Sequence, residues 1–232
     1  MNRFRSIFKN KHTVLPVVHV SELSQALRNV AIVVEGGADG AFLINHACEA
    51  ATLFEIYQEV RTSFPDLWVG LNLLDLEPLW PVRYPSVAGA WADSAYILEL
   101  KEEQHVAENI RHCLRDITKW EGLYFGGVAF KGQRKVRPEH LTQAAQKSLP
   151  FLDVVTTSGP GTGRSAPLEK IRVMKEAIGD FPLAIASGIT PENVAEYLPH
   201  ADCFLVASGI SDDFENLSLS RTRDLVERVK GK

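Results

Sequence analysis

The chain has 232 residues, of which 45% are hydrophobic and 23% charged, and this is the composition of a globular protein that can bury a substantial core. A formal net charge of -4 excludes a general attraction to nucleic acid or to an anionic membrane, so we expect neither as a partner. No apolar stretch approaches the roughly 20 residues of a membrane span. Cys48, Cys113 and Cys203 are odd in number and far apart, which favours reduced thiols in a cytoplasmic protein.

A basic cluster opens the chain, with Arg3, Arg5, Lys9 and Lys11 interleaved with aromatic and aliphatic residues. We expect residues 1–12 to form an N-terminal extension that is frayed or docked as a short helix. An amphipathic anchor or a targeting segment is the alternative.

Apolar, β-rich runs alternate along the rest of the chain with segments of helical period. The runs predict eight strands, at residues 14–20, 40–45, 68–74, 94–100, 123–130, 152–157, 182–186 and 203–207. The third connection, residues 75–93, is irregular because it contains three prolines and little helical period. There we expect a long loop and a short helix.

Most of the predicted strands are continuous apolar runs, which is typical of strands buried on both faces of a parallel sheet. Strict alternation of strands and helices with short connections predicts right-handed βαβ units. Eight such units in this length predict a single-domain α/β protein, a (βα)8 TIM barrel. An open doubly wound sheet is the alternative.

The last two predicted strands end in the same way. One is followed by Ser187-Gly188-Ile189 and the next by Ser208-Gly209-Ile210, 21 residues later. Glycine lets the backbone approach a ligand closely, serine adds a hydroxyl donor, and barrels often bind phosphate between the last two strand ends. We therefore predict a phosphate site at Ser187, Gly188, Ser208 and Gly209, with a small extra helix after Gly209. Two ordinary tight turns are the alternative.

The same region carries a resemblance. The stretch IASGITPENVAEYL, followed by ADCFLVASGI, is similar to the C-terminal quarter of the ribulose-phosphate-binding barrels, which include phosphoribosylanthranilate isomerase. Together with EGGADGAFLINH, VGLNLL and TTSGPGTG, it more closely resembles the BtpA family. The resemblance implies a barrel that grips a substrate phosphate. The Lys-x-Cys-Gly motif of the isomerase has no counterpart, since VVHV stands there, and this argues against the isomerase reaction.

A glycine-rich loop, residues 157–167, follows the sixth predicted strand and is rich in hydroxyl groups. Its spacing matches neither a Walker loop nor a dinucleotide fingerprint. We predict a lid or second anion contact in which Arg164 clamps a carboxylate or phosphate. An ordinary mobile loop is the alternative. The substrate contacts expected here are Ser158, Gly161, Gly163 and Arg164.

Polar side chains at other predicted strand ends are candidates for chemistry, because the active site of a barrel lies at these ends. We predict proton transfer by Glu99, His19 and Lys131, with Glu99 as the general acid or base. The substrate contacts expected from strand ends are Asn45, Asn72 and Thr156. Each has a structural alternative, such as a loop cap, a buried histidine or a salt bridge from Glu99 to Lys101 or Lys131.

Metals and cofactors have little support in the sequence. Asp75 and Glu77 give only a weak divalent-cation signal, and no Cys/His set has zinc spacing, so we expect no metal and no cofactor. Exposed apolar residues near the third connection would suit a homodimer, and burial over the barrel is the alternative. The residues concerned are Leu79, Trp80, Tyr84 and Trp91.

These observations favour an enzyme that binds a phosphorylated small molecule, a ribosyl or other sugar phosphate. Isomerisation, a lyase step and phosphoribosyl transfer all remain open. The alternative is a barrel without catalysis that serves as an assembly or regulatory factor, as members of the BtpA family are described.

Overall fold

Eight parallel strands close into a barrel in which every strand pairs with its neighbours in sequence and β8 pairs with β1. The computed structural model describes residues 2–74 and 76–231. The strands are β1 (Thr13–His19), β2 (Gly40–Ile44), β3 (Trp68–Asn72), β4 (Gly89–Ala92), β5 (Leu123–Gly127), β6 (Val154–Thr157), β7 (Leu183–Ala186) and β8 (Cys203–Val206). The prediction of a single-domain (βα)8 barrel is confirmed.

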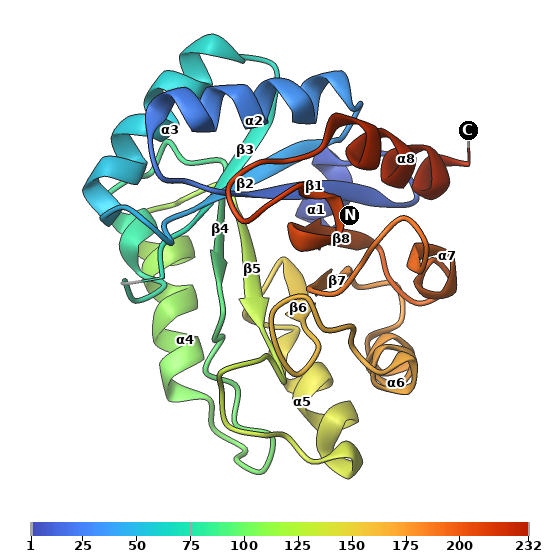
Figure 1. The fold of residues 1–232 in the computed structure, drawn as a ribbon. Coiled ribbons are helices and arrows are strands. Elements are labelled where there is room, and N and C mark those ends of the chain that lie inside the picture. Colours follow the sequence, from blue (N-terminus) through green and yellow to red (C-terminus); the bar gives the residue numbers. More distant parts are fainter. Residues whose placement is uncertain (1, 75, 232) are drawn as a thin grey trace.

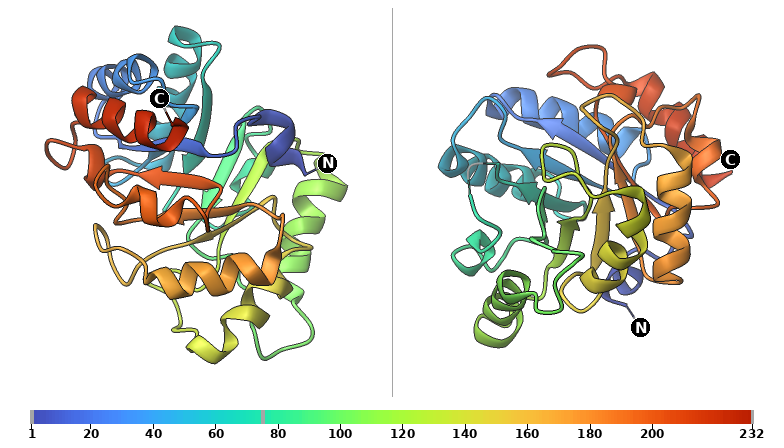
Figure 2. Two further views of the ribbon diagram at one scale, coloured as in Figure 1. Left: turned by 90° about the vertical axis from the view of Figure 1, so that its right-hand side faces the viewer. Right: turned by 90° about the horizontal axis from the view of Figure 1, so that it is seen from below.

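Helices surround the barrel (Figures 1 and 2). The α-helices are α1 (Arg3–Ile7), α2 (Leu23–Glu35), α3 (Ala50–Ser63), α4 (His105–Arg111), α5 (Leu141–Ser148), α6 (Leu168–Ile178), α7 (Val194–Tyr197) and α8 (Leu219–Lys230). A π-helical segment, His112–Ile117, continues α4, and 3-10 turns lie at Trp80–Val82, Pro138–His140 and Ser208–Ile210. No helix of the described residues is long and apolar enough to cross a membrane.

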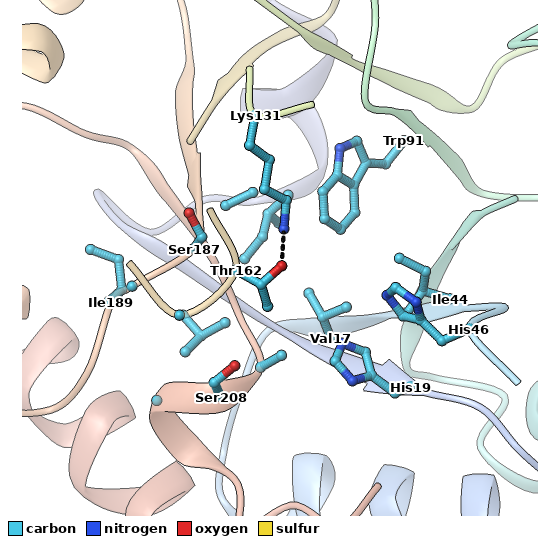
Figure 3. Close-up of a pocket in the computed structure, with 17 residues that line it drawn as sticks. Val17, His19, Ile44, His46, Trp91, Lys131, Thr162, Ser187, Ile189 and Ser208 are labelled. Carbon is cyan, nitrogen blue, oxygen red and sulfur yellow. Dashed lines mark hydrogen bonds between the residues drawn. The ribbon is translucent and has the colours of Figure 1, made fainter. Parts of the chain in front are cut away.

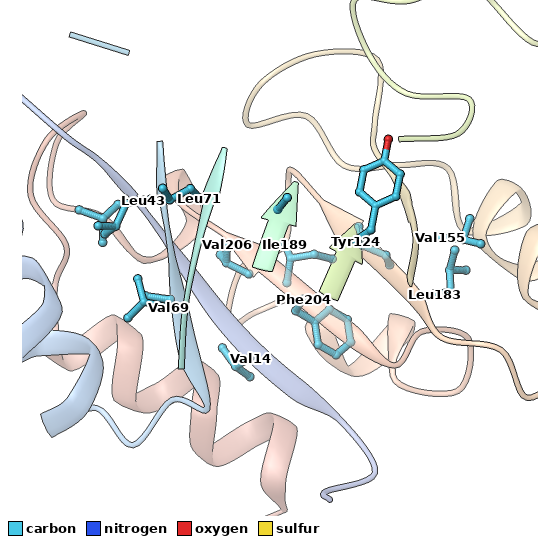
Figure 4. Close-up of a cluster of buried hydrophobic side chains, with 14 of the residues drawn as sticks. Val14, Leu43, Val69, Leu71, Tyr124, Val155, Leu183, Ile189, Phe204 and Val206 are labelled. Atoms are coloured by element: carbon cyan, nitrogen blue, oxygen red, sulfur yellow. The ribbon is translucent and has the colours of Figure 1, made fainter. Parts of the chain in front are cut away.

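The main apolar core lies between the strands and the surrounding helices (Figure 4). Alternate residues of the strands point outward into this layer, as do Val14 and Val18 of β1. The residues between them point into the barrel, where aromatic rings pack against one another. Phe42, for example, makes edge-to-face contacts with Trp91 and Phe125, with ring centroids 5.7 and 5.0 Å apart. The barrel interior is therefore a packed core.

The N-terminal segment closes the base of the barrel. Phe4 and Phe8 are buried, and their rings contact Phe125 and Trp68. Because Trp68 is the first residue of β3, this contact lies at the amino ends of the strands, opposite the expected site. Helix α1 therefore packs as part of the barrel core.

The position of strand four differs from the prediction. Residues 94–100, SAYILEL, form no strand, and Tyr96 adopts a left-handed φ of 57° that interrupts extended pairing. The strand is instead the short segment GAWA of β4. A β-carbon at Gly89 would lie 2.4 Å from the Trp68 ring, so glycine is required at this position.

The four apolar residues expected near a dimer surface do not form an exposed patch. Trp80 and Trp91 are 4% and 5% exposed, and Leu79 and Tyr84 are partly buried against the main core. Trp91 belongs to β4 and points into the barrel. A homodimer stays a prediction, without this patch to support it.

Candidate functional site

A small pocket lies at the carboxyl ends of the strands (Figure 3). Its volume is about 50 Å³, and none of the acidic side chains that the structure describes lines it. The lining residues are Val17, His19, Ile44, His46, Trp91, Lys131, Thr162, Gly163, Ala186, Ser187, Gly188, Ile189, Leu205, Val206, Ala207, Ser208 and Gly209. All four residues predicted to bind phosphate are among them.

The junction after β7 has an unusual backbone. Ser187 and Gly188 have φ values of 137° and 68°, which side chains with a β-carbon rarely adopt. A β-carbon at Gly188 would lie 2.2 Å from the backbone nitrogen of Ser165. Glycine is needed at this position both for its φ and for the close approach of the neighbouring loop.

The junction after β8 packs directly on the turn after β7. A β-carbon at Gly209 would lie 1.9 Å from the carbonyl oxygen of Ile189, so the two backbones are in contact at that point. The small extra helix predicted after Gly209 is wrong: the short 3-10 turn Ser208–Ile210 starts one residue earlier, and residues 211–217 form a loop closed by a bridge. The two Ser-Gly junctions converge on one pocket.

The loop after β6, residues 158–165, covers one side of the pocket. Ser187 Oγ accepts a hydrogen bond from the N–H of Gly159 at 3.0 Å and donates one to the carbonyl of Arg164 at 3.4 Å. Thr162 Oγ1 accepts from Lys131 Nζ at 3.0 Å. The loop is therefore clasped to the β7 turn and to the loop after β5.

Lys131 and Asp93 form a charged group beside the pocket. Asp93 follows β4 directly, and its Oδ1 accepts a hydrogen bond from Asn72 Nδ2 at 3.2 Å. Burial raises the pKa of Asp93, while Asn72 and the charges of Lys131 and His46 oppose that rise. The Asp93 carboxyl is therefore placed to exchange a proton at a pH nearer neutral than an exposed aspartate.

Two histidines at the ends of β1 and β2 meet beside the pocket. The ring centroids of His19 and His46 lie 4.7 Å apart, and the Phe214 ring lies 4.3 Å from that of His19. Burial, and secondarily the neighbouring His46, lowers the pKa of His19 to about 4. His19 Nδ1 lies 3.0 Å from the Phe214 carbonyl. Because a carbonyl only accepts, Nδ1 carries the proton and Nε2 keeps a free lone pair.

Several buried polar side-chain atoms have no hydrogen-bond partner among the described residues, and two of them lie near the carboxyl ends of their strands. These two are Thr156 Oγ1 on β6 and Trp91 Nε1 on β4. Buried polar groups are normally paired, and each such exception needs an explanation. A water or a polar group of a ligand at the mouth would pair these atoms.

Glu99 does not lie where the sequence predicted it. Because residues 94–100 form no strand, Glu99 stands in the connection after β4 and does not line the pocket. Its carboxylate is 3% exposed and receives both terminal N–H groups of Arg134. This pairing lowers the pKa of Glu99 and keeps it ionised. The geometry makes Glu99 a structural anchor for the segment that carries Arg134, and it argues against proton transfer by this residue.

Of the other predicted substrate contacts, some line the pocket and others hold the loops around it. Asn45 Oδ1 accepts from the N–H of Leu74 and so holds the loop after β3, away from the pocket. Arg164 and Gly161 belong to the covering loop but do not line the pocket, whereas Gly163 does. Ser158 Oγ accepts from the N–H of Lys131 at 2.7 Å and so positions that lysine.

The candidate group in the structure contains residues that the sequence analysis did not propose as site residues. Asp93 was missed because strand four was placed after it, whereas it directly follows β4. His46 follows the predicted contact Asn45 among the polar residues at strand ends, and Thr162 is a hydroxyl of the glycine-rich loop; the structure places both in the pocket lining.

Metal ligands are not grouped in the part of the chain that the structure describes. Residues 2–74 and 76–231 contain no cluster of three or more His, Cys, Asp or Glu side chains suited to a metal ion. Asp75 lies outside the described residues, and Glu77 Oε2 accepts a hydrogen bond from the Tyr96 hydroxyl at 2.9 Å.

Comparison with known sequences gives one short match. No family model matches the chain. The chain is 40% identical to the uncharacterised protein TK2179 of Thermococcus kodakarensis over 81 residues, which is 34% of this chain and 31% of that protein. The match thus spans about a third of either chain.

Solved structures resemble this chain over nearly its whole length. GGGPS from Thermoplasma volcanium has a TM-score of 0.72 at 15% identity and covers 99% of this chain and 96% of its own. The (S)-3-O-geranylgeranylglyceryl phosphate synthase of Thermoplasma acidophilum has a TM-score of 0.71 at 13% identity, covering 99% and 97%. Phosphoribosyl anthranilate isomerase from Thermus thermophilus has a TM-score of 0.61 at 18% identity, covering 94% and 98%. At these identities the likeness concerns the fold.

Proposed function

We propose that this barrel is an enzyme acting on a phosphorylated small molecule, a ribosyl or other sugar phosphate, whose phosphate lies between the β7 and β8 junctions. The convergence of the two Ser-Gly junctions on one pocket, with no carboxylate of residues 2–74 or 76–231 in its lining, carries this proposal. A phosphate needs several donors that converge on one point, and closely approaching backbone amides supply them. The Ser208 hydroxyl adds a further donor.

The size of the pocket fits a phosphate group better than a whole substrate. A volume of about 50 Å³ holds a group the size of a few water molecules. The rest of the substrate would extend toward His19, Lys131 and Asp93. Two structural neighbours support the ligand class, because one is named for a phosphoribosyl compound and another was solved with its substrate sn-glycerol-1-phosphate.

The polar groups beside the pocket suit proton transfer next to a developing negative charge. His19 Nε2 is unprotonated and can accept a proton, and Asp93, with its raised pKa, can donate or accept one. The Lys131 ammonium would stabilise an enolate or a leaving oxyanion. Such a set serves an isomerisation, a lyase step or a phosphoribosyl transfer.

Binding of sugar phosphates tests the proposal. Ribose 5-phosphate, phosphoribosyl pyrophosphate and glycerol 1-phosphate are added to the protein, and the free energy of unfolding is measured. A ligand at 100 times its Kd stabilises the fold by about 2.7 kcal/mol. Ser208→Asp should abolish this gain by placing a carboxylate in the phosphate position, whereas Ser24→Asp, on the exposed surface of α2, should keep it.

A ligand that stabilises Ser208→Asp as well as the parent protein would refute the assigned phosphate position. Binding without any turnover of the bound compounds would favour the alternative of a barrel that serves as an assembly or regulatory factor.

A further inference from the structure

A second and much larger cavity lies beside the mouth pocket. Its volume is about 730 Å³, against about 50 Å³ for the mouth pocket. It runs between the connection after β5, residues 129–141, and the first turns of α6, which lies next to α5 (Figure 1). We refer to it as the α6 groove. Its volume is in the range typical of small-molecule sites, roughly 300–1,000 Å³.

The wall of the α6 groove is largely apolar. Phe130 and Leu141 are buried side chains at its edge, and Val136 and Val173 are partly buried. Three prolines, Pro138, Pro160 and Pro167, complete the lining. Such a wall suits the hydrocarbon or aromatic body of a ligand.

One partly buried cation, Lys170, lies in this apolar lining. Lys170 Nζ donates to the carbonyls of Ala129 at 2.6 Å and Ser158 at 2.7 Å, which leaves it a third N–H. It forms no ion pair with a carboxylate among the described residues, and burial lowers its pKa to about 8. A perturbed ionisable group in a cleft is a recognised mark of a binding site.

The carboxylates near this lysine are already engaged. Glu169 pairs with Arg172 at 2.7 Å, and Glu139 lies 3.9 Å from Arg137. Lys131 and Lys135 also line the groove, and they too have no ion pair within the described residues. The groove thus combines an apolar wall with uncompensated positive charge.

We propose that the α6 groove is a binding site for a small amphipathic anion, a carboxylate or phosphate ester on an apolar body, with its charge at Lys170 and its body against Phe130 and Val173. The site is separate from the mouth pocket but adjoins it. Lys131 lines both, and the loop after β6 contributes Ser158 to the groove and Thr162 to the mouth. A ligand in the groove would therefore contact the same loop that covers the phosphate position.

Octanoate and octyl phosphate are the probes, with 1-octanol and octylamine as the neutral and cationic comparisons. Calorimetry should show one saturable site for the anions and a preference of about tenfold or more over the uncharged alcohol, because a hydrogen bond to a charged group contributes about 1.5–3 kcal/mol. Octanoate should also protect Lys170 from labelling by trinitrobenzenesulfonate. A stronger response to octyl phosphate or to octanoate identifies the anionic group.

Two variants separate binding from folding. Lys170→Met removes the ammonium charge together with its hydrogen bonds to two backbone carbonyls. Val173→Glu keeps those hydrogen bonds and adds to the groove wall a negative charge, which repels an anionic ligand. Both should weaken octanoate binding about tenfold or more. Lys9→Met, an exposed lysine at the opposite end of the barrel, should leave it unchanged.

Equal affinity for octylamine and octanoate, or unchanged octanoate binding in folded Val173→Glu, would overturn the proposal. Ser208→Asp should lose sugar phosphates and keep octanoate, so that a failure of the mouth assignment and a failure of the groove assignment give different results.

Discussion

At the scale of single residues, the site depends on positions where a β-carbon has no room. Gly188 combines a left-handed φ of 68° with backbone atoms of Arg164 and Ser165 that a β-carbon would meet at 2.4 Å or less. Ser187, its neighbour, keeps a side chain at a φ of 137°. Strained backbone of this kind concentrates at functional sites, because the surrounding structure must hold it in place.

Gly188→Ala should therefore lower the free energy of unfolding by more than about 1 kcal/mol, since both φ and the contact oppose the added methyl group. Gly161→Ala, in the loop after β6 that packs on this turn, is the matched control. Its nearest added contact is at 3.6 Å, so its stability should stay within about 0.5 kcal/mol. Urea unfolding of the two variants measures both free energies of unfolding. An equal decrease in the two variants would contradict the close packing at Gly188.

The pH dependence of stability should reflect His19. The unfolded chain binds its imidazole proton near pH 6.5, whereas the folded chain binds it only near pH 4. Between these values the unfolded state holds more protons, so stability falls as the pH is lowered through this window and is unaffected above it. His12 and His46, whose pKa values burial also lowers, add to the same slope.

His19→Asn should make stability between pH 6.5 and 4 less dependent on pH. The measurements are unfolding free energies across this range and an NMR titration of the imidazole of His19. An imidazole that titrates near pH 6.5 in the folded protein would show that burial does not control this group.

At the scale of elements, the prediction that is easiest to contradict concerns α1. This helix has only five residues but closes the base of the barrel. Phe4→Ala should destabilise the protein by about 3–5 kcal/mol, because Phe4 is fully buried and leaves a cavity. Ile7, 42% exposed on the same helix, is the control, and Ile7→Ala should change stability by about 0.5 kcal/mol or less. Thermal and urea unfolding would show whether the helix belongs to the cooperative unit; similar effects of the two substitutions would count against it.

Strand four shows why one element escaped the sequence. The segment SAYILEL has the composition of a buried strand, yet β4 is GAWA, with three small residues around one tryptophan. The glycine at the start of this strand is required by Trp68, a side chain of the neighbouring strand β3 that fills the space beside Gly89. The residues of β4 by themselves do not reveal that Trp68 packs against them, so the sequence of this strand resembled that of a loop.

The same displacement accounts for the error in the site. With strand four placed too late, Glu99 occupied its end in the prediction and Asp93 fell inside a connection. Seven strands and the paired Ser-Gly junctions were predictable because their signals are local, in apolar runs and in glycine. The charge interactions of Asp93 with Lys131 and His46 join three different connections, and only closure of the barrel brings these residues together.

At the scale of the whole molecule, the two ends of the barrel have different tasks. The base is sealed by Phe4, Phe8 and the aromatic interior, and the opposite end gathers polar groups from almost every strand. This separation of stability from chemistry is typical of (βα)8 barrels. It explains why substitutions at the base should affect unfolding, whereas those at the mouth should affect ligands.

Lys131 donates to Thr162, and Ser187 bonds to Gly159 and Arg164, so the loop after β6 is joined to the segments that follow β5 and β7. A substrate that extends from the phosphate position toward Lys131 would compete with the bond between Lys131 and Thr162, because both residues line the pocket. Entry of a substrate then depends on opening of the loop after β6. The observed rate constant of binding should therefore reach a plateau at high substrate concentration.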